Sequence, residues 1–507
     1  MNNFSVIDFV VLLFYLVAVA LLGSLSGGKQ KSSESYFVGD RNVPWWAIAF
    51  SIVATETSTL TFISIPGLAY LTNLNFLQVT VGYLIGRIVI SFIFLPAYAK
   101  GNLKTAYSLL SSRFGDKTKN FASGTFLVTQ IIGGGVRLFA TAIPLAIILK
   151  TFAYFASFSN IHIYILSIIL ITLITMIYTF FGGIKGVIWV DVLQMGIYIG
   201  GALIAVVIAY NALPNGLSDI GKFAGGTNKF QVINWGFGNG FATFLKTPYT
   251  LIGSLIGGCF LSMASHGTDQ LIVQRLLTAK NLKDSRKAII SSGVIVILQF
   301  ALFLFVGLLL FAFYKGVAPG SAAASFIKSD EIFPHFIVNH LPVGVKGLIL
   351  AGLFAAAMST LAGSVSSLSS STMLDLYKPY FGQNNSEEKD LFISRMITIG
   401  WGIVLSLTAF LFIGILQSVV EIALSIASIT YGGLLGTFIL GALFLKVKQK
   451  AAIIGFASGI FTMVLIVLVP ILFGSKAVFH WTWFTFIGTI VTVAVGNIAQ
   501  YFFKGNE

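Results

Sequence analysis

Long apolar runs separated by short polar segments recur along the whole chain and set its predicted architecture. A helix needs about 20 mainly apolar residues to cross a bilayer. Runs of this kind predict thirteen helices, which cover approximately residues 5–26, 44–70, 74–98, 120–149, 162–181, 187–211, 248–276, 287–314, 344–377, 391–415, 418–445, 450–474 and 478–503. The pattern therefore predicts an all-α polytopic membrane protein whose residues 1–507 form a single membrane domain.

The range 44–70 departs from this pattern because it is polar at its centre. Residues 54–61 read ATETSTLT, which places Glu56 and several hydroxyl groups where a spanning helix meets hydrocarbon. A carboxylate at that depth costs roughly 3 kcal/mol or more unless it faces protein or a water-filled cavity. We therefore interpret this stretch as a functional site. The alternative is a helix that is merely kinked by hydroxyl groups bonded to its own carbonyls.

A second interrupted helix is predicted at 248–276, where paired glycines, Ser262, Ser265 and His266 lie at membrane depth. Five helices in 44–211 and five in 248–445 would then each begin with an interrupted member. This is the pattern expected of an inverted-repeat transporter. The range 5–26 would be an extra N-terminal helix, and 450–503 would hold two extra C-terminal helices.

Composition supports the membrane assignment and removes several classes of function. Of the 507 residues, 56% are apolar and only 9% are charged. A net charge of +14 would suggest nucleic acid as the partner of a soluble protein, but here most Lys and Arg lie between the predicted helices. The sequence has neither a phosphate-binding loop of the GxxxxGK[ST] type nor a metal-protease cluster, so we expect no enzyme and no ATPase.

The basic residues also predict the orientation in the membrane. One set of alternate loops, to which we assign Arg275, holds most of the 31 Lys and Arg residues. Cytoplasmic loops carry such an excess. The pattern thus predicts a plasma-membrane protein with its N-terminus outside and its C-terminus in the cytoplasm. The long outer segments 212–247 and 315–343 are expected to be connectors or partial lids.

Two stretches could together bind a small cation. A helix broken within the membrane exposes backbone carbonyls, and these can replace the hydration shell of a hard cation. Further oxygen ligands could come from residues 355–372, AAAMSTLAGSVSSLSSST, where Ala356, Ser359 and Thr360 share one helical face. The same small residues are also typical of plain helix packing.

Four other polar residues lie within predicted spans. Asp191 could sense or relay a cation, or could be satisfied by a neighbouring donor. Arg137 follows three glycines and could bind a solute carboxylate or pair with Glu56. Arg87 is interpreted as structural or snorkelling. His266 could hydrogen-bond a polar solute or hold helices together.

The chain resembles the sodium:solute symporter family, which includes sodium-coupled sugar, proline, sialic acid, iodide, vitamin and monocarboxylate transporters. The resemblance covers nearly the whole chain. It rests on YFVGDRNVPWWAIAFSIVATETSTLTFISIPGLAY, GGIKGVIWVDVLQ, TDQLIVQR and AAAMSTLAGSVSSLSSSTMLDLY, in this order. The family implies a leucine-transporter-type fold, a ten-helix inverted-repeat core with extra terminal helices, and alternating access driven by sodium.

The resemblance also implies particular ion ligands. The principal sodium site would use the carbonyls of Ala54, Thr57 and Ala356 and the hydroxyls of Ser359 and Thr360. Some members bind a second sodium through an aspartate, matched here by Asp191, and two hydroxyl residues. Those two positions are Ala362 and Gly363 in this chain, so one sodium per cycle is expected.

Solute contacts in the family match a further set of positions, namely Glu56, Ser58, Thr61, Phe76, Thr80 and His266. The arginine that holds the carboxylate in sialic acid members falls at Gly133, and Arg137 lies one turn later. If Glu56 pairs with Arg137, a neutral sugar or polyol is expected. If Glu56 is free, a cationic or zwitterionic solute is expected.

We therefore expect a sodium-coupled importer of a small polar organic solute, such as a sugar, an organic acid or an amino-acid-like compound. Sodium would be the co-transported ion, and the bilayer and the solute would be the other partners. One alternative is a proton-coupled carrier of the same fold that uses Glu56 or Asp191. The other is a channel or a receptor-like relative without coupled accumulation.

Overall fold

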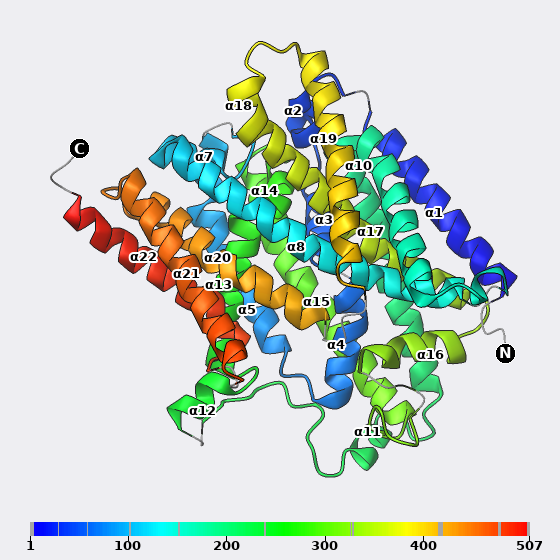
Figure 1. Ribbon diagram of the computed structural model, residues 1–507. Coiled ribbons are helices and arrows are strands. Elements are labelled where there is room, and N and C mark those ends of the chain that lie inside the picture. Colours follow the sequence, from blue (N-terminus) through cyan, green and yellow to red (C-terminus); the bar gives the residue numbers. More distant parts are fainter. Residues whose placement is uncertain are drawn as a thin grey trace.

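The computed structural model describes residues 5–28, 30–57, 59–100, 103–150, 153–237, 240–324, 326, 329–413, 419–474 and 478–503 (Figure 1). Side chains are not described for residues 59–60, 143–144, 147–148, 153, 156, 355–356, 419–426, 428 and 471. Ser58, one of the predicted solute contacts, lies outside the described residues, and of Ala356 only the backbone is described.

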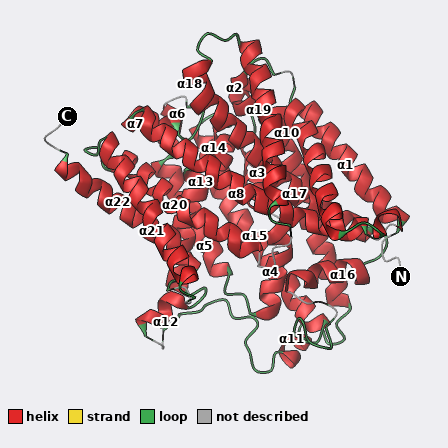
Figure 2. Ribbon diagram, in the orientation of Figure 1, coloured by secondary structure: helices red, strands yellow, loops and turns green. Residues whose placement is uncertain are grey.

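Helices occupy the predicted spans. A helix, or a pair of helices separated by a break, lies at each predicted range, and the described residues form no strand beyond one isolated bridge between Val43 and Ala279 (Figure 2). Nine helical stretches among the described residues are long and apolar enough to cross a membrane, and a bent pair makes a tenth. The unbroken ones include α1 (Val6–Ser26), α5 (Leu77–Ile93), α8 (Asp116–Leu149), α15 (Leu282–Phe313), α17 (Val345–Ser371), α19 (Glu387–Phe410), α20 (Val419–Leu443), α21 (Gln449–Leu472) and α22 (Phe484–Phe502).

Two predicted spans, 162–181 and 187–211, are joined in one long element, α10 (Asn160–Asn211). Gly183 breaks the regular path within it, with φ 54° and ψ −156°. A side chain at this position would meet the carbonyl oxygen of Tyr36 at 2.7 Å, so only glycine fits both the backbone angle and the space. The helix therefore changes course where the sequence predicts a short link.

The polar centre of 44–70 is a true helix break. The helix α3 (Trp45–Glu56) ends at Glu56, and α4 (Thr59–Leu71) continues at an angle of 63° to it. Thr57 has non-helical angles, φ −81° and ψ 88°. The predicted interruption is confirmed.

The second interruption lies between α13 (Leu251–Gly267) and α14 (Gln270–Leu277). Asp269 caps α14, because its carboxylate accepts a hydrogen bond from the Leu271 backbone N–H at 2.8 Å. The paired glycines lie inside α13 and do not break it. A Cβ on Gly258 would come within 2.4 Å of the Val79 carbonyl oxygen, so this glycine brings α13 close to α5.

The broken helix α3 lies at the centre of the bundle, in contact with α10, α15 and α17. The helices α20, α21 and α22 pack together at one end of the molecule, and α1 packs on α10 at the other (Figure 1). The start of α1 and the end of α22 lie on opposite sides of the bundle, as expected for an odd number of crossings.

The two long predicted connectors lie on one side of the bundle (Figure 1). They carry the short helices α11 (Ser218–Phe223), α12 (Phe241–Lys246) and α16 (Ile332–His340). Lys229 joins the first connector to the end of α4, because its amino group donates to the carbonyls of Tyr70 at 2.7 Å and Thr72 at 2.9 Å. It also lies 4.1 Å from the ring centre of Phe311. The connector is thus tied to the outer half of the broken helix.

Candidate ion and solute site

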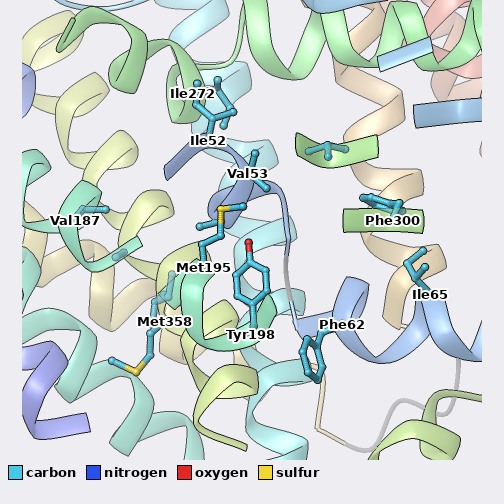
Figure 3. Close-up of a cluster of buried hydrophobic side chains, with 14 of the residues drawn as sticks. Ile52, Val53, Phe62, Ile65, Val187, Met195, Tyr198, Ile272, Phe300 and Met358 are labelled. Carbon is cyan, nitrogen blue, oxygen red and sulfur yellow. The ribbon is translucent and has the colours of Figure 1, made fainter. Parts of the chain in front are cut away.

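The end of α3 presents backbone carbonyls that the helix does not use. The last four carbonyls of a helix lack intrahelical donors. Here the Val53 carbonyl accepts the Thr57 N–H at 2.9 Å, and both Ala54 and Thr57 are fully buried. The Thr57 hydroxyl accepts a hydrogen bond from the Gln299 side chain of α15. Figure 3 shows the Tyr198 hydroxyl of α10 directed toward this end of α3.

The helix α17 brings hydroxyl groups to the same region, since it packs against both α3 and α4. Ser359 is fully buried, and its Oγ has no hydrogen-bond partner among the described residues. Thr360 is buried beside it. Carbonyl and hydroxyl oxygens are the ligands that a hard cation prefers. The donor set predicted for sodium is therefore chemically suited to that ion as cargo.

Asp191 lies next to this set and is paired with an arginine. Its Oδ2 accepts from the Ser51 hydroxyl at 2.5 Å and from Arg275 Nη2 at 3.1 Å. Both charged side chains are fully buried. Oδ1 makes no hydrogen bond within the described part of the chain, although the Ser359 side chain lies next to the carboxylate.

Further polar atoms without partners surround Asp191. Burying such an atom is unfavourable unless something satisfies it. Within the described residues, the unpartnered atoms near this carboxylate include both amide atoms of Gln194 and the hydroxyls of Tyr15 and Tyr198. This concentration of unsatisfied groups is typical of a functional site rather than of helix packing.

Glu56 has a different arginine as its partner from the one considered in the sequence. The Glu56 carboxylate contacts Arg87 of α5, and the His266 ring of α13 lies 3.5 Å away. Arg87 also donates to the Ser292 hydroxyl of α15 at 2.8 Å. Its side chain is completely buried, so the interpretation of Arg87 as snorkelling is wrong. The alternative in which Glu56 pairs with Arg137 is likewise not what the structure has.

The contacts of His266 select one tautomer of the neutral ring. Its Nε2 lies 3.0 Å from Arg87 Nη2, which can only donate, so Nε2 accepts. Its Nδ1 then carries the hydrogen and donates to the Ser265 hydroxyl at 2.7 Å. His266 thus extends the polar cluster of Glu56 and Arg87, and α3, α5, α13 and α15 meet there.

The remaining predicted solute residues lie in varied surroundings. Phe76 stacks on Phe300 with ring centres 5.3 Å apart, and the Thr80 hydroxyl donates to its own helix at the Leu77 carbonyl. Thr61 is half-buried in α4. Arg137 is half-buried on α8 and acts on the charge of Asp269, which itself accepts from Tyr431 at 2.8 Å and from Gln130 at 3.2 Å.

Sequence reasoning missed the role of Arg275 and misjudged that of Arg87. Arg275 was assigned to a cytoplasmic loop, but it lies inside α14 with a fully buried side chain. Its apolar flanks in QLIVQRLL were a usable signal, since a loop arginine usually has polar neighbours. Arg87 lies in the apolar run GYLIGRIVISF, which carries the same signal.

A membrane-spanning helix broken at its centre, with carbonyls and hydroxyls gathered at the break, defines a secondary active transporter. The model of the family described as "Sodium:solute symporter family" matches residues 36–479. The chain belongs to this family, and its fold is the leucine-transporter type.

Individual relatives differ in the solute that their names give. A sodium/sialic acid symporter of Aliivibrio fischeri is 28% identical over 513 residues, which covers 100% of this chain and 95% of the relative. A sodium-dependent multivitamin transporter of Oryctolagus cuniculus is 28% identical and covers 90% of this chain and 70% of the relative. The solved structure of a substrate-bound, outward-open sodium-coupled sialic acid symporter, described as having a novel sodium site, superposes with a TM-score of 0.84 at 27% identity over 98% of both chains.

Proposed function

We propose that this protein imports a small polar organic solute by sodium-coupled alternating access, with one sodium per cycle. The observation that carries the proposal is the meeting of the α3 break with the buried, unpartnered Ser359 hydroxyl beside Asp191. Membership of the family and the sodium-coupled relatives support the same function.

The ion ligands in this proposal are the carbonyls of Ala54, Thr57 and Ala356 and the hydroxyls of Ser359 and Thr360. One charge that moves down 100 mV releases about 2.3 kcal/mol. A tenfold sodium gradient adds about 1.4 kcal/mol. Together these terms support an accumulation on the order of a thousandfold, which is sufficient for nutrient uptake.

The solute would be bound by Glu56, Ser58, Thr61, Phe76, Thr80, Arg137 and His266. Because Arg87 matches the charge of Glu56 and His266 can remain neutral, this cluster has no net charge. That favours a neutral hydroxylated solute, such as a sugar or polyol, over a cation. Sialic acid and other carboxylates remain in the test because Arg137 is near enough to act on charges at the bundle centre.

The arrangement in the membrane follows the basic-residue pattern. We place the N-terminus outside and the C-terminus in the cytoplasm of the plasma membrane. The repeats would be residues 44–211 and 248–445, each of which begins with a broken helix, α3–α4 and α13–α14. Residues 5–26 and 450–503 would add the extra helices.

Proton coupling through Glu56 or Asp191 is not favoured. Each of these carboxylates contacts a guanidinium whose side chain is fully buried, an arrangement suited to a carboxylate that stays charged. Uptake in sodium-free buffer under an imposed proton gradient would instead support the proton-coupled alternative.

The test begins with a screen for the solute. Purified protein is heated with sugars, polyols, amino acids and organic acids, including sialic acid, in sodium chloride or in choline chloride. A true solute should raise the unfolding temperature more in sodium. Uptake of that solute into proteoliposomes should then require an inward sodium gradient.

The assigned ion ligands are tested with Ser359→Ala combined with Thr360→Ala. Losing two oxygen ligands of a cation should raise the sodium concentration for half-maximal uptake at least about tenfold, since a hydrogen bond or contact to a charge contributes about 1.5–3 kcal/mol. Ser367→Ala with Ser369→Ala is the matched control, because those hydroxyls donate to carbonyls of their own helix. An unchanged sodium requirement in the first double variant would reject the assigned site.

A further inference from the structure

Arg275 places a permanent positive charge deep inside the bundle. All of its nitrogens donate: Nε to the Ser51 hydroxyl at 2.8 Å, Nη1 to the Leu271 carbonyl at 2.7 Å, and Nη2 to Asp191 at 3.1 Å. The guanidinium therefore connects α3, α10 and α14. Removing such a charge from water is costly, so its position calls for a physical reason.

The guanidinium also lies directly against α17. A Cβ added to Gly363 would be 2.8 Å from Arg275 Nη2 and 3.3 Å from Nη1. A side chain at position 363 and the guanidinium at its present place therefore exclude each other. Gly363 comes four residues after Ser359, so the guanidinium lies one helical turn from a proposed sodium ligand on the same face.

Asp191 connects the guanidinium with the proposed sodium ligands. Its Oδ2 is taken by Ser51 and Arg275, while Oδ1 has no hydrogen bond among the described residues and lies on the side of Ser359. A buried carboxylate beside hydroxyl groups is by its chemistry a place for a small cation. Here a side-chain cation already holds one face of that carboxylate.

We infer that Arg275 is a built-in cation that takes the place of a second sodium at Asp191 and so limits this protein to one transported sodium. The inference rests on the proposed function and adds its stoichiometry and the residue that determines it. The charge of Asp191 is balanced by a group that cannot leave, and a mobile cation at the same carboxylate is repelled. Gly363 is required because it leaves room for the guanidinium.

The experiment uses radioactive sodium alone, because it needs no knowledge of the solute. Sodium bound per purified chain is measured to saturation, with choline keeping the ionic strength constant. The wild type should bind one ion and Arg275→Gln two. Arg275→Lys, which keeps the charge, should bind one. A folded Arg275→Gln protein that binds only one ion would overturn the inference.

Two further variants keep the test decisive if Arg275→Gln does not fold. Asp191→Asn with Arg275→Gln removes both charges together and should bind one sodium with an affinity within threefold of wild type. No binding in this variant would make Asp191 a ligand of the single sodium and refute the inference. Arg275→Gln with Gly363→Ser adds a hydroxyl in the freed space and should bind two ions, whereas one ion would also refute it.

The outcomes separate this inference from the proposed function. If the wild type binds no sodium, the proposed function itself fails. If it binds one and the charge-removing variants gain none, only the role of Arg275 fails. If it binds two, the single-sodium stoichiometry and the role of Arg275 both fail, while sodium coupling stands.

Discussion

Two arginine–carboxylate pairs lie inside the helix bundle, and they differ in how closely they are enclosed. In both, the arginine side chain is fully buried. The carboxylate of Asp191 is fully buried too, whereas 15% of the Glu56 side chain is exposed. The neighbours also differ: Glu56 and Arg87 meet His266 and Ser292, while Asp191 and Arg275 meet Ser51 and the Leu271 carbonyl.

The same chemistry therefore serves two purposes in the proposed mechanism. A carboxylate that keeps an exposed edge can still be reached by a solute that enters from water. A carboxylate enclosed on all sides can be reached only by a small ion, and at Asp191 the guanidinium already holds one side. The degree of enclosure, rather than the type of residue, distinguishes the solute cluster from the ion cluster.

The largest effect is expected where the pair is most deeply buried. Asp191→Ala leaves the Arg275 charge enclosed without a counter-charge, which should lower the free energy of unfolding by about 3–5 kcal/mol. Thermal unfolding in detergent measures this loss. Asp191→Asn with Arg275→Gln should recover most of it, and an Asp191→Ala protein as stable as wild type would show that the pair is not enclosed.

A smaller loss is expected at the partly exposed pair. Glu56→Ala should lower the free energy of unfolding by about 1–3 kcal/mol, because water can partly replace the missing carboxylate around Arg87. The same variant should lose sodium-dependent stabilisation by the solute. Glu56→Gln, which keeps an acceptor for Arg87, is the matched control. Equal losses for Glu56→Ala and Asp191→Ala would remove the contrast between the two clusters.

Accessibility can be compared directly because the chain has a single cysteine. In a Cys259→Ser background, Glu56→Cys and Ser51→Cys place one thiol in each cluster. A small, charged thiol reagent should modify residue 56 at least about tenfold faster than residue 51, which is fully buried beside Arg275. Equal modification rates would mean that water reaches both clusters alike.

Lys229 shows what a buried cation does without any carboxylate partner among the described residues, and its effect should be the smallest. Burial lowers the pKa of Lys229 to about 8, from an ordinary value of 10.5. Between these values the unfolded chain holds a proton that the folded chain has released, so the free energy of unfolding should rise with pH from about 8 to 10.5.

The measurement for Lys229 is thermal unfolding of wild type and Lys229→Met across that range. The difference between the two curves isolates this lysine from all others. Wild-type stability relative to the variant should increase toward pH 10.5. A difference that stays constant with pH would mean that Lys229 keeps its ordinary pKa despite its carbonyl partners.

The sequence alone determined the spans and the site of the break, because both depend on local properties. Hydrophobic length requires a membrane helix wherever some 20 apolar residues follow one another. The polar stretch around Glu56 marked the interruption of α3 for the same local reason, and the order of the family motifs identified the class of transporter. The second break was displaced from the glycines to Thr268 and Asp269, since Gly258 serves packing rather than bending.

Only the tertiary structure decided which arginine faces which carboxylate. Arg87 and Arg137 both lie in apolar helices, and nothing local shows which helix approaches Glu56. The choice follows from packing: a Cβ on Gly86 would lie 2.4 Å from the Cys259 carbonyl, so α5 is held tightly against α13 and Arg87 is brought beside His266. Arg275 reached Asp191 in the same way, because α14 enters the bundle after its break and packs on α3 and α17. Charge pairing within a membrane bundle depends on the close approach of helix backbones, and that approach is a property of the whole fold.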